Sequence, residues 1–172
     1  DALIAPYHRD ERELLFEHLA ALEAGCLLLL DMGYPAFRVF AALQTRKIAW
    51  CARVALDTWS VVRDFLAAGQ ADAAVTLEPH TEALADCRAH GLPTTPIRVR
   101  LIRVRLPTGN IEVLMTSLLD PDTYPADAFA ELYHLRWAQE ECYKGFKSRV
   151  EVENWSGKSA LTICQDFHAK VL

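Results

Sequence analysis

A stripe of charged and aromatic residues runs through the segment 133–147. Its members are spaced three, four, four and three residues apart: Tyr133, Arg136, Glu140, Lys144 and Lys147. On a helix of 3.6 residues per turn they fall within an arc of roughly 80°. One carboxylate therefore lies among three cations, so that the acid could hold a metal ion while the cations follow a phosphate backbone. The alternative is an exposed helix face whose ion pairs contribute only about 0.2–0.5 kcal/mol each.

A second acid, Asp31, follows directly on four consecutive leucines. This run predicts a strand buried on both faces, with the carboxylate at its carboxyl end. Ligands of open α/β sheets bind outside those ends, so Asp31 is placed to bind a metal ion or a proton. The alternative is a turn residue that helps the chain bend at Gly33-Tyr34-Pro35.

The elements that must position these residues alternate between strand and helix. Strands are expected at 1–6 (the end of a strand), 26–30, 48–55, 73–77, 97–106 and 111–119. Helices are expected at 9–24, 35–45, 60–68, 81–90, 125–149 and 159–172. This order predicts an α/β fold whose first strands are parallel. The helix over 125–149 is expected to turn Leu132 and Leu135 toward the core and the charged stripe away from it.

The composition indicates a globular protein without a membrane partner. Of the 172 residues, 52% are hydrophobic and 24% charged, and the net charge is −5. The longest uninterrupted apolar run is five residues, whereas a membrane helix needs about 20. Five cysteines without a C-x-x-C pair predict reduced thiols in a cytoplasmic protein. The negative net charge argues only weakly against nucleic-acid binding, because a local basic patch is compatible with it.

One such patch is expected on the strand over 97–106. It carries four arginines: Arg98, Arg100, Arg103 and Arg105. They alternate and then shift phase, and a β-bulge would return all four to one face. That face would either bind phosphates or be a solvated outer surface that protects a sheet edge.

The stripe and Asp31 together resemble DDE transposases of bacterial insertion sequences. The pattern Tyr133-x2-Arg136-x3-Glu140-x6-Lys147 matches the Y-R-E-K signature of that family. The four leucines with Asp31-Met-Gly-Tyr resemble the segment around the family's second catalytic Asp.

Two flanking segments extend the resemblance. Trp50-Cys-Ala-Arg53-Val54 resembles the next strand of the family, which carries an arginine, and residues 151–158 resemble the stretch after the signature helix. The resemblance covers most of the chain and is least specific over 56–96.

The resemblance implies a ribonuclease-H-like fold with a β-rich insertion at about 48–119, between the strand of the second Asp and the Glu helix. Residues 1–172 would be an N-terminally truncated catalytic domain that begins at the third strand of the fold. Asp1 cannot be the family's first catalytic Asp, because only one helix separates it from Asp31. We therefore expect this segment alone to fold and to be inactive.

The implied activity is metal-dependent DNA cleavage and strand transfer at insertion-sequence ends. Asp31 and Glu140 would be catalytic and bind Mg²⁺ or Mn²⁺, with carboxylates within roughly 8 Å of each other. The implied DNA contacts are Tyr133, Arg136, Lys144, Lys147 and Arg53. The partners would be transposon-end and target DNA and a second copy of the chain, associated with the bacterial nucleoid. The alternatives are a non-catalytic DNA-binding remnant and a metal-dependent nuclease of the same fold.

Overall fold

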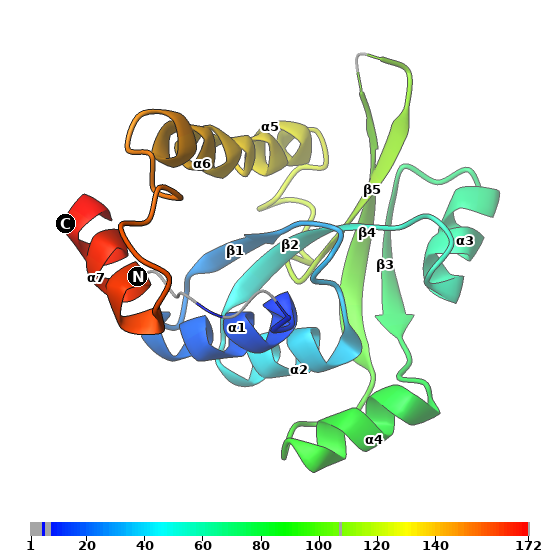
Figure 1. Cartoon of the computed structure of the whole chain (residues 1–172). Helices are drawn as coiled ribbons and strands as arrows, with labels where there is room; N and C mark the ends of the chain where they lie inside the picture. Colours follow the sequence, from blue (N-terminus) through cyan, green and yellow to red (C-terminus); the bar gives the residue numbers. More distant parts are fainter. Residues whose placement is uncertain (1–4, 6–7, 107, 172) are drawn as a thin grey trace. The chain divides into compact units, whose positions relative to one another are not determined.

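The computed structural model describes residue 5 and residues 8–106 and 108–171. They form two compact units, one of residues 8–133 and one of residue 5 with residues 134–171 (Figure 1). The predicted strand end over 1–6 falls almost entirely outside the described residues. Within the described part of the chain, no helix has both the length and the apolar composition needed to cross a bilayer.

The first unit combines helices with a five-stranded sheet. Its strands are β1 (Leu27–Leu30), β2 (Ala49–Val54), β3 (Asp72–Leu77), β4 (Ile97–Arg105) and β5 (Ile111–Thr116). Its helices are α1 (Glu11–His18), the short 3-10 helix η1 (Leu19–Ala21), α2 (Phe37–Thr45), α3 (Ser60–Ala67), α4 (Thr81–Ala89) and α5 (Ala128–His134). The second unit contains α6 (Trp137–Ser148) and α7 (Ala160–Val171).

The sheet is mixed, with the strand order β1-β2-β5-β4-β3. β1 and β2 are parallel and are connected through α2, as a parallel pair requires a crossover. All other neighbours are antiparallel. The predicted α/β class is therefore confirmed, and the segment after β2 adds three strands to the same sheet (Figure 1).

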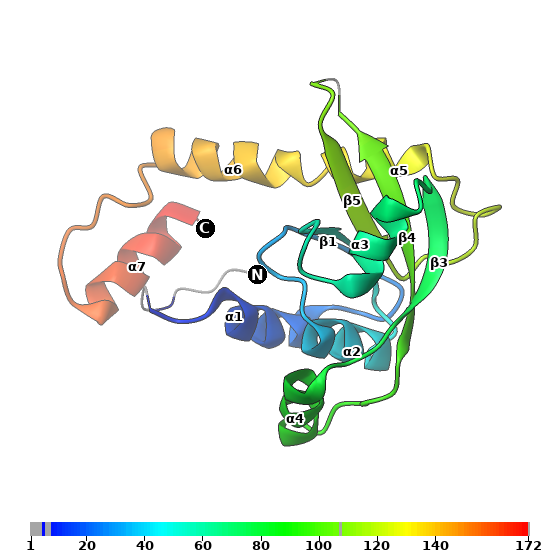
Figure 2. The same cartoon turned by 90° about the vertical axis from the view of Figure 1, so that its right-hand side faces the viewer.

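Two hydrophobic clusters cover the two faces of this sheet. The larger cluster joins strand side chains to α1, α2, α3 and α4, and in it the fully buried Trp50 stacks on Phe40 with ring centroids 3.9 Å apart. The smaller cluster joins Cys51 and Leu114 to Phe129 of α5. Figure 2 shows α2 and α5 on opposite sides of the sheet. The sheet therefore has a face covered by four helices and a face covered by α5.

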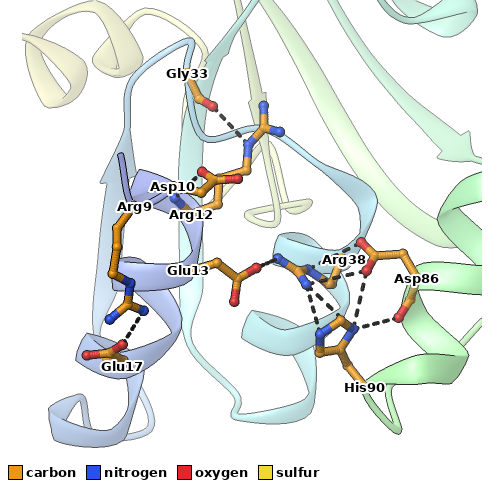
Figure 3. A network of polar contacts seen from close by, with 9 residues as sticks. All are labelled: Arg9, Asp10, Arg12, Glu13, Glu17, Gly33, Arg38, Asp86 and His90. Atoms are coloured by element: carbon orange, nitrogen blue, oxygen red, sulfur yellow. Dashed lines mark hydrogen bonds and ion pairs between the residues drawn. The ribbon is translucent and has the colours of Figure 1, made fainter. Parts of the chain in front are cut away.

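A largely buried arginine connects three helices of the first unit (Figure 3). Arg38 of α2, whose side chain is 10% exposed, pairs with Glu13 of α1 and lies 3.3 Å from the carboxylate of Asp86 on α4. His90 lies 3.0 Å from the same guanidinium group. These contacts hold α2, the helix that follows the Asp31 loop, against α1 and α4.

The arginines of β4 do not share one face, so the predicted bulge and single basic face are wrong. β4 pairs in unbroken register with both of its neighbours. Arg100 is 2% exposed and donates to the two carboxylate oxygens of Asp72 at 2.7 and 2.5 Å. Arg103 lies on the other face and donates to the backbone carbonyl of Leu66. The phase shift in the sequence thus separates the arginines between two faces, and Arg100 and Arg103 each bind a partner on their own face.

The predicted helix over 125–149 is divided. α5 ends at His134, and after two turn residues the N–H groups of Ala138 and Gln139 donate to carbonyls three positions earlier. This tighter turn aligns side chains three residues apart, and the rings of His134 and Trp137 stack with centroids 5.7 Å apart.

The prediction that Leu132 and Leu135 both face the core is also partly wrong. Tyr133 is 5% exposed and lies in the smaller cluster, and Leu132 packs against the same cluster as predicted. Leu135, in contrast, is 62% exposed. The charged stripe therefore begins inside the first unit and not on its outer surface.

Candidate functional site

Three charged side chains form a row across β1, β2 and β5. Arg53 of β2 pairs with Leu114 of β5, and Glu112 lies two residues from Leu114 on the same face. Asp31 follows directly on β1, whose parallel register with β2 brings it beside Arg53. The row lies on the face that α5 covers, at the carboxyl ends of the two parallel strands.

Arg53 bridges the two carboxylates of this row. Its Nη2 donates to Oδ1 of Asp31 and its Nη1 donates to Oε1 of Glu112, both at 2.9 Å. The hydrogen bond to Glu112 raises the pKa of Arg53 most; burial opposes this rise, and the charge of Asp31 adds to it. The predicted contact of Arg53 with DNA stays a prediction.

Tyr133, the first residue of the signature pattern, contacts the strand that precedes Asp31. Its hydroxyl donates to the backbone carbonyl of Leu30 at 3.1 Å, across 103 positions of sequence. Because Leu30 directly precedes Asp31, the contact places the first signature residue beside the charged row.

The backbone after Asp31 is held at two points. The N–H of Tyr34 donates to the carbonyl of Asp31 at 3.1 Å and closes a turn. The Nε of Arg12 on α1 donates to the carbonyl of Gly33 at 3.0 Å (Figure 3). Asp31 therefore serves the turn through its backbone, while its carboxylate pairs with Arg53. The two roles predicted for Asp31, turn residue and candidate ligand, do not exclude each other, because they use different groups of the residue.

The other signature residues belong to the second unit. Nη1 of Arg136 lies 2.8 Å from Oε1 of Glu140, and the two side chains are 11% and 45% exposed. Lys144 and Lys147 are exposed, and each pairs with a nearby glutamate. Because Glu140 and Asp31 belong to different units, their proximity stays a prediction.

Comparisons with known protein families, with curated proteins and with solved structures find no match for this chain. Asp31 offers carboxylate oxygen, the donor that Mg²⁺ prefers, and its chemistry fits one ligand of such an ion. Among the described residues, no three His, Cys, Asp or Glu side chains lie together as a metal site.

Glu112 is the member of the row that sequence reasoning missed. It begins the second strand of a hairpin, where an exposed acid is ordinary. The available signal was its isolation, because it is the first acid after Asp86 in a strongly basic stretch. Its partner Arg53 is 59 residues away, and only the register of β5 against β2 brings the two together.

The contact between Tyr133 and Leu30 gives a stability prediction. Tyr133→Phe keeps the buried ring and removes the hydroxyl donor, so we expect the free energy of unfolding to fall by about 1 kcal/mol. Urea unfolding of the purified chain measures this change. Tyr143→Phe is the matched control, because Tyr143 is 57% exposed and its change should stay within about 0.5 kcal/mol. Equal effects of the two substitutions would contradict a structural role for the Tyr133 hydroxyl.

Proposed function

We propose that this chain is part of the ribonuclease-H-like catalytic domain of a DDE transposase of bacterial insertion sequences. The observation that carries the proposal is the hydrogen bond from Tyr133 to the carbonyl of Leu30. The bond joins Tyr133, the first residue of the signature pattern, to the residue that directly precedes Asp31. A transposase active site needs the strand acid to be adjacent to the signature pattern, and this contact supports that adjacency for the first residue of the pattern.

The order of the strands also supports the proposal. A parallel pair, β1 and β2, carries an acid at its carboxyl end, and the following segment extends the sheet beyond β2. Among the described strands, β1 forms one edge of the sheet. We propose that the strand with the family's first catalytic Asp pairs with β1 at this edge.

In this proposal the candidate residues have different roles. Asp31 and Glu140 hold Mg²⁺ or Mn²⁺, which when bound activate the attacking hydroxyl and stabilise the leaving oxygen of a phosphodiester. Arg136, Lys144 and Lys147 bind phosphates of the transposon end. Tyr133, in α5, binds the backbone of β1 at the residue before Asp31. The partners are transposon-end and target DNA and a second copy of the chain at the bacterial nucleoid.

A second candidate is a non-catalytic DNA-binding remnant of such a transposase. It is favoured by the ion pairs of the two candidate acids, since Asp31 pairs with Arg53 and Glu140 pairs with Arg136. Such pairs would hold a fold together without any metal ion. A nuclease of the same fold differs from the transposase in strand transfer, which an assay with end DNA and target plasmid measures.

The test uses the protein made from the complete reading frame that contains this segment. Asp31→Asn should lower Mg²⁺-dependent cleavage of end DNA by more than about 100-fold, because even outer-shell partners of a metal ion matter roughly 10- to 100-fold. Asp64→Asn, on the exposed side of α3, removes the same charge and should cleave normally. Absence of cleavage by the unmodified protein favours the remnant. Normal cleavage by Asp31→Asn would overturn the assignment.

A further inference from the structure

β3 forms an open edge of the sheet. It is the last strand in the order β1-β2-β5-β4-β3, so β4 is its single neighbour among the described strands. α3 packs on the face of the larger cluster, and Figure 2 shows this helix to one side of β3. A free edge presents unpaired backbone N–H and C=O groups to any strand that approaches it.

The register with β4 identifies the backbone groups that point outward. The N–H of Arg103 donates to the carbonyl of Ala71 at 2.8 Å, and opposite residues of an antiparallel pair alternate between bonded and non-bonded positions. The residues that bond to β4 are therefore 73, 75 and 77, and those that direct their N–H and C=O groups to the free edge are 72, 74 and 76. Among the described residues, no hydrogen bond reaches the outward groups of Ala74 or Thr76.

β3 lacks the features that usually protect an edge strand from pairing. Such strands are blunted by lysine, proline, bulges or inward-pointing charges. β3 contains no lysine or proline and pairs with β4 without a bulge. Its one charged side chain, Asp72, is held by Arg100. The strand is therefore suited to accept a further strand.

A second copy of β3 fits this edge in one register. When the two strands run antiparallel, Ala74 lies opposite Ala74 of the second copy on a two-fold axis, and Asp72 lies opposite Thr76 of the second copy. A shift by two residues would place Asp72 opposite Glu78 of the second copy, and like charges directly opposite destabilise a pair. The opposite shift would place Thr76 against Gln70, which lies outside the strand.

The charges are complementary in this register. Arg98 of β4 lies opposite Thr76, and its side chain is exposed. Because Thr76 would in turn face Asp72 of the second copy, Arg98 and that carboxylate share a row on one face of the joined sheet, with about 10 Å between their strands. The two-fold axis supplies this pair twice, so the charges favour a second copy over an unrelated strand.

We propose that the free edge of β3 is a self-association surface, on which a second copy of this chain pairs antiparallel and joins two sheets into one. The inference gives the second copy named in the proposed function a place on the molecule. It rests on the sheet alone, so it can fail while the assignments of Asp31 and Glu140 stand. A single strand pair is a small interface, so the dimer is weak.

Hydrogen exchange of the purified chain, without DNA or metal, tests the pairing directly. We expect the amides of Ala74 and Thr76 to become protected as the protein concentration rises, because they gain acceptors only in the dimer. The amides of Ala73 and Val75 are bound to β4 and should be protected at every concentration. Sedimentation velocity measures the dimer over the same concentrations.

Two substitutions should weaken the dimer without removing a hydrogen bond between β3 and β4. Ala74→Pro removes an outward N–H from each copy and should raise the dimer Kd by at least about 10-fold. Arg98→Glu brings an acid into the row of Asp72 of the second copy and should raise the Kd by at least about 5-fold. Arg105→Glu is the matched control, because Arg105 is exposed at the other end of β4, and should change the Kd by less than about 2-fold.

Three outcomes would overturn the inference. They are a chain that stays monomeric at millimolar concentration, aggregates without a defined dimer, and a dimer whose Kd neither Ala74→Pro nor Arg98→Glu changes. If Ala74→Pro does not fold, Arg98→Glu and the exchange of the unmodified chain decide the question. None of these results bears on DNA cleavage, which tests the proposed function separately.

Discussion

Glu140→Gln is expected to abolish DNA cleavage and to leave binding of transposon-end DNA largely intact. The substitution keeps the shape of the side chain and removes the charge of a proposed metal ligand, so cleavage should fall by more than about 100-fold. It also removes the ion pair with Arg136, in which Glu140 is 45% exposed, and a pair of this kind contributes only about 0.3–0.5 kcal/mol. Cleavage and gel-shift assays with the protein from the complete reading frame measure the two effects.

Lys147→Ala is expected to affect DNA binding, which Glu140→Gln should leave largely intact. Lys147 is exposed and pairs with Glu153 at 2.8 Å, so its removal should hardly affect folding. As a phosphate contact it should instead weaken DNA binding and reduce the slope of log affinity against log salt by about 0.9. Arg88→Ala, an exposed cation on α4, is the control and should leave the slope unchanged.

Two outcomes would contradict the roles proposed for Glu140 and Lys147. Normal cleavage by Glu140→Gln would end the catalytic assignment of this residue. A normal salt slope for Lys147→Ala would end the phosphate assignment, and the stripe on α6 would then be an ordinary solvated helix face.

Asp72→Ala is expected to cause a large loss of stability in the first unit. It leaves Arg100, which is 2% exposed, without the carboxylate that receives its Nε and Nη2. Removing one partner of a buried ion pair costs roughly 3–5 kcal/mol. The backbone carbonyl of Tyr124 still accepts from Nη1, so we expect about 3 kcal/mol. In a chain of this size that corresponds to a melting temperature lower by about 6–12 °C.

The double variant Asp72→Ala with Arg100→Met tests the mechanism of this loss. It removes both charges, so it should recover much of the stability, as replacement of buried pairs by apolar residues often does. Arg98→Met is the matched control on the same strand, where the side chain is exposed, and should change stability by no more than about 0.5 kcal/mol. A double variant less stable than Asp72→Ala alone would contradict the unpaired-charge explanation.

Local sequence patterns predicted most of the fold. The four leucines, the helix after Pro35 and the hairpin around Gly109 were readable because apolar period and turn residues act over a few positions. The division of the helix over 125–149 was not readable, since no Gly or Pro marks it. The bulge predicted in β4 was wrong for a related reason. A phase shift in the sequence fits either a bulge or arginines on both faces, and only the partners Asp72 and Leu66 decide between them.

The sequence by itself determined the elements beside which the candidate residues Asp31 and Glu140 lie. Asp31 after the leucine strand and Glu140 on a polar helix follow from spacing and composition alone. The predicted burial of this strand on both faces is wrong, because β1 lies at one end of the strand order among the described strands, and Leu27 is 38% exposed while Leu30 is buried. The tertiary structure decided which side chains meet. Tyr133 turns inward to the carbonyl of Leu30, and Glu112 joins Arg53, because strand register and helix docking are set by the whole core. Contacts across 59 and 103 positions leave no local pattern, so they emerge only when the sheet is assembled.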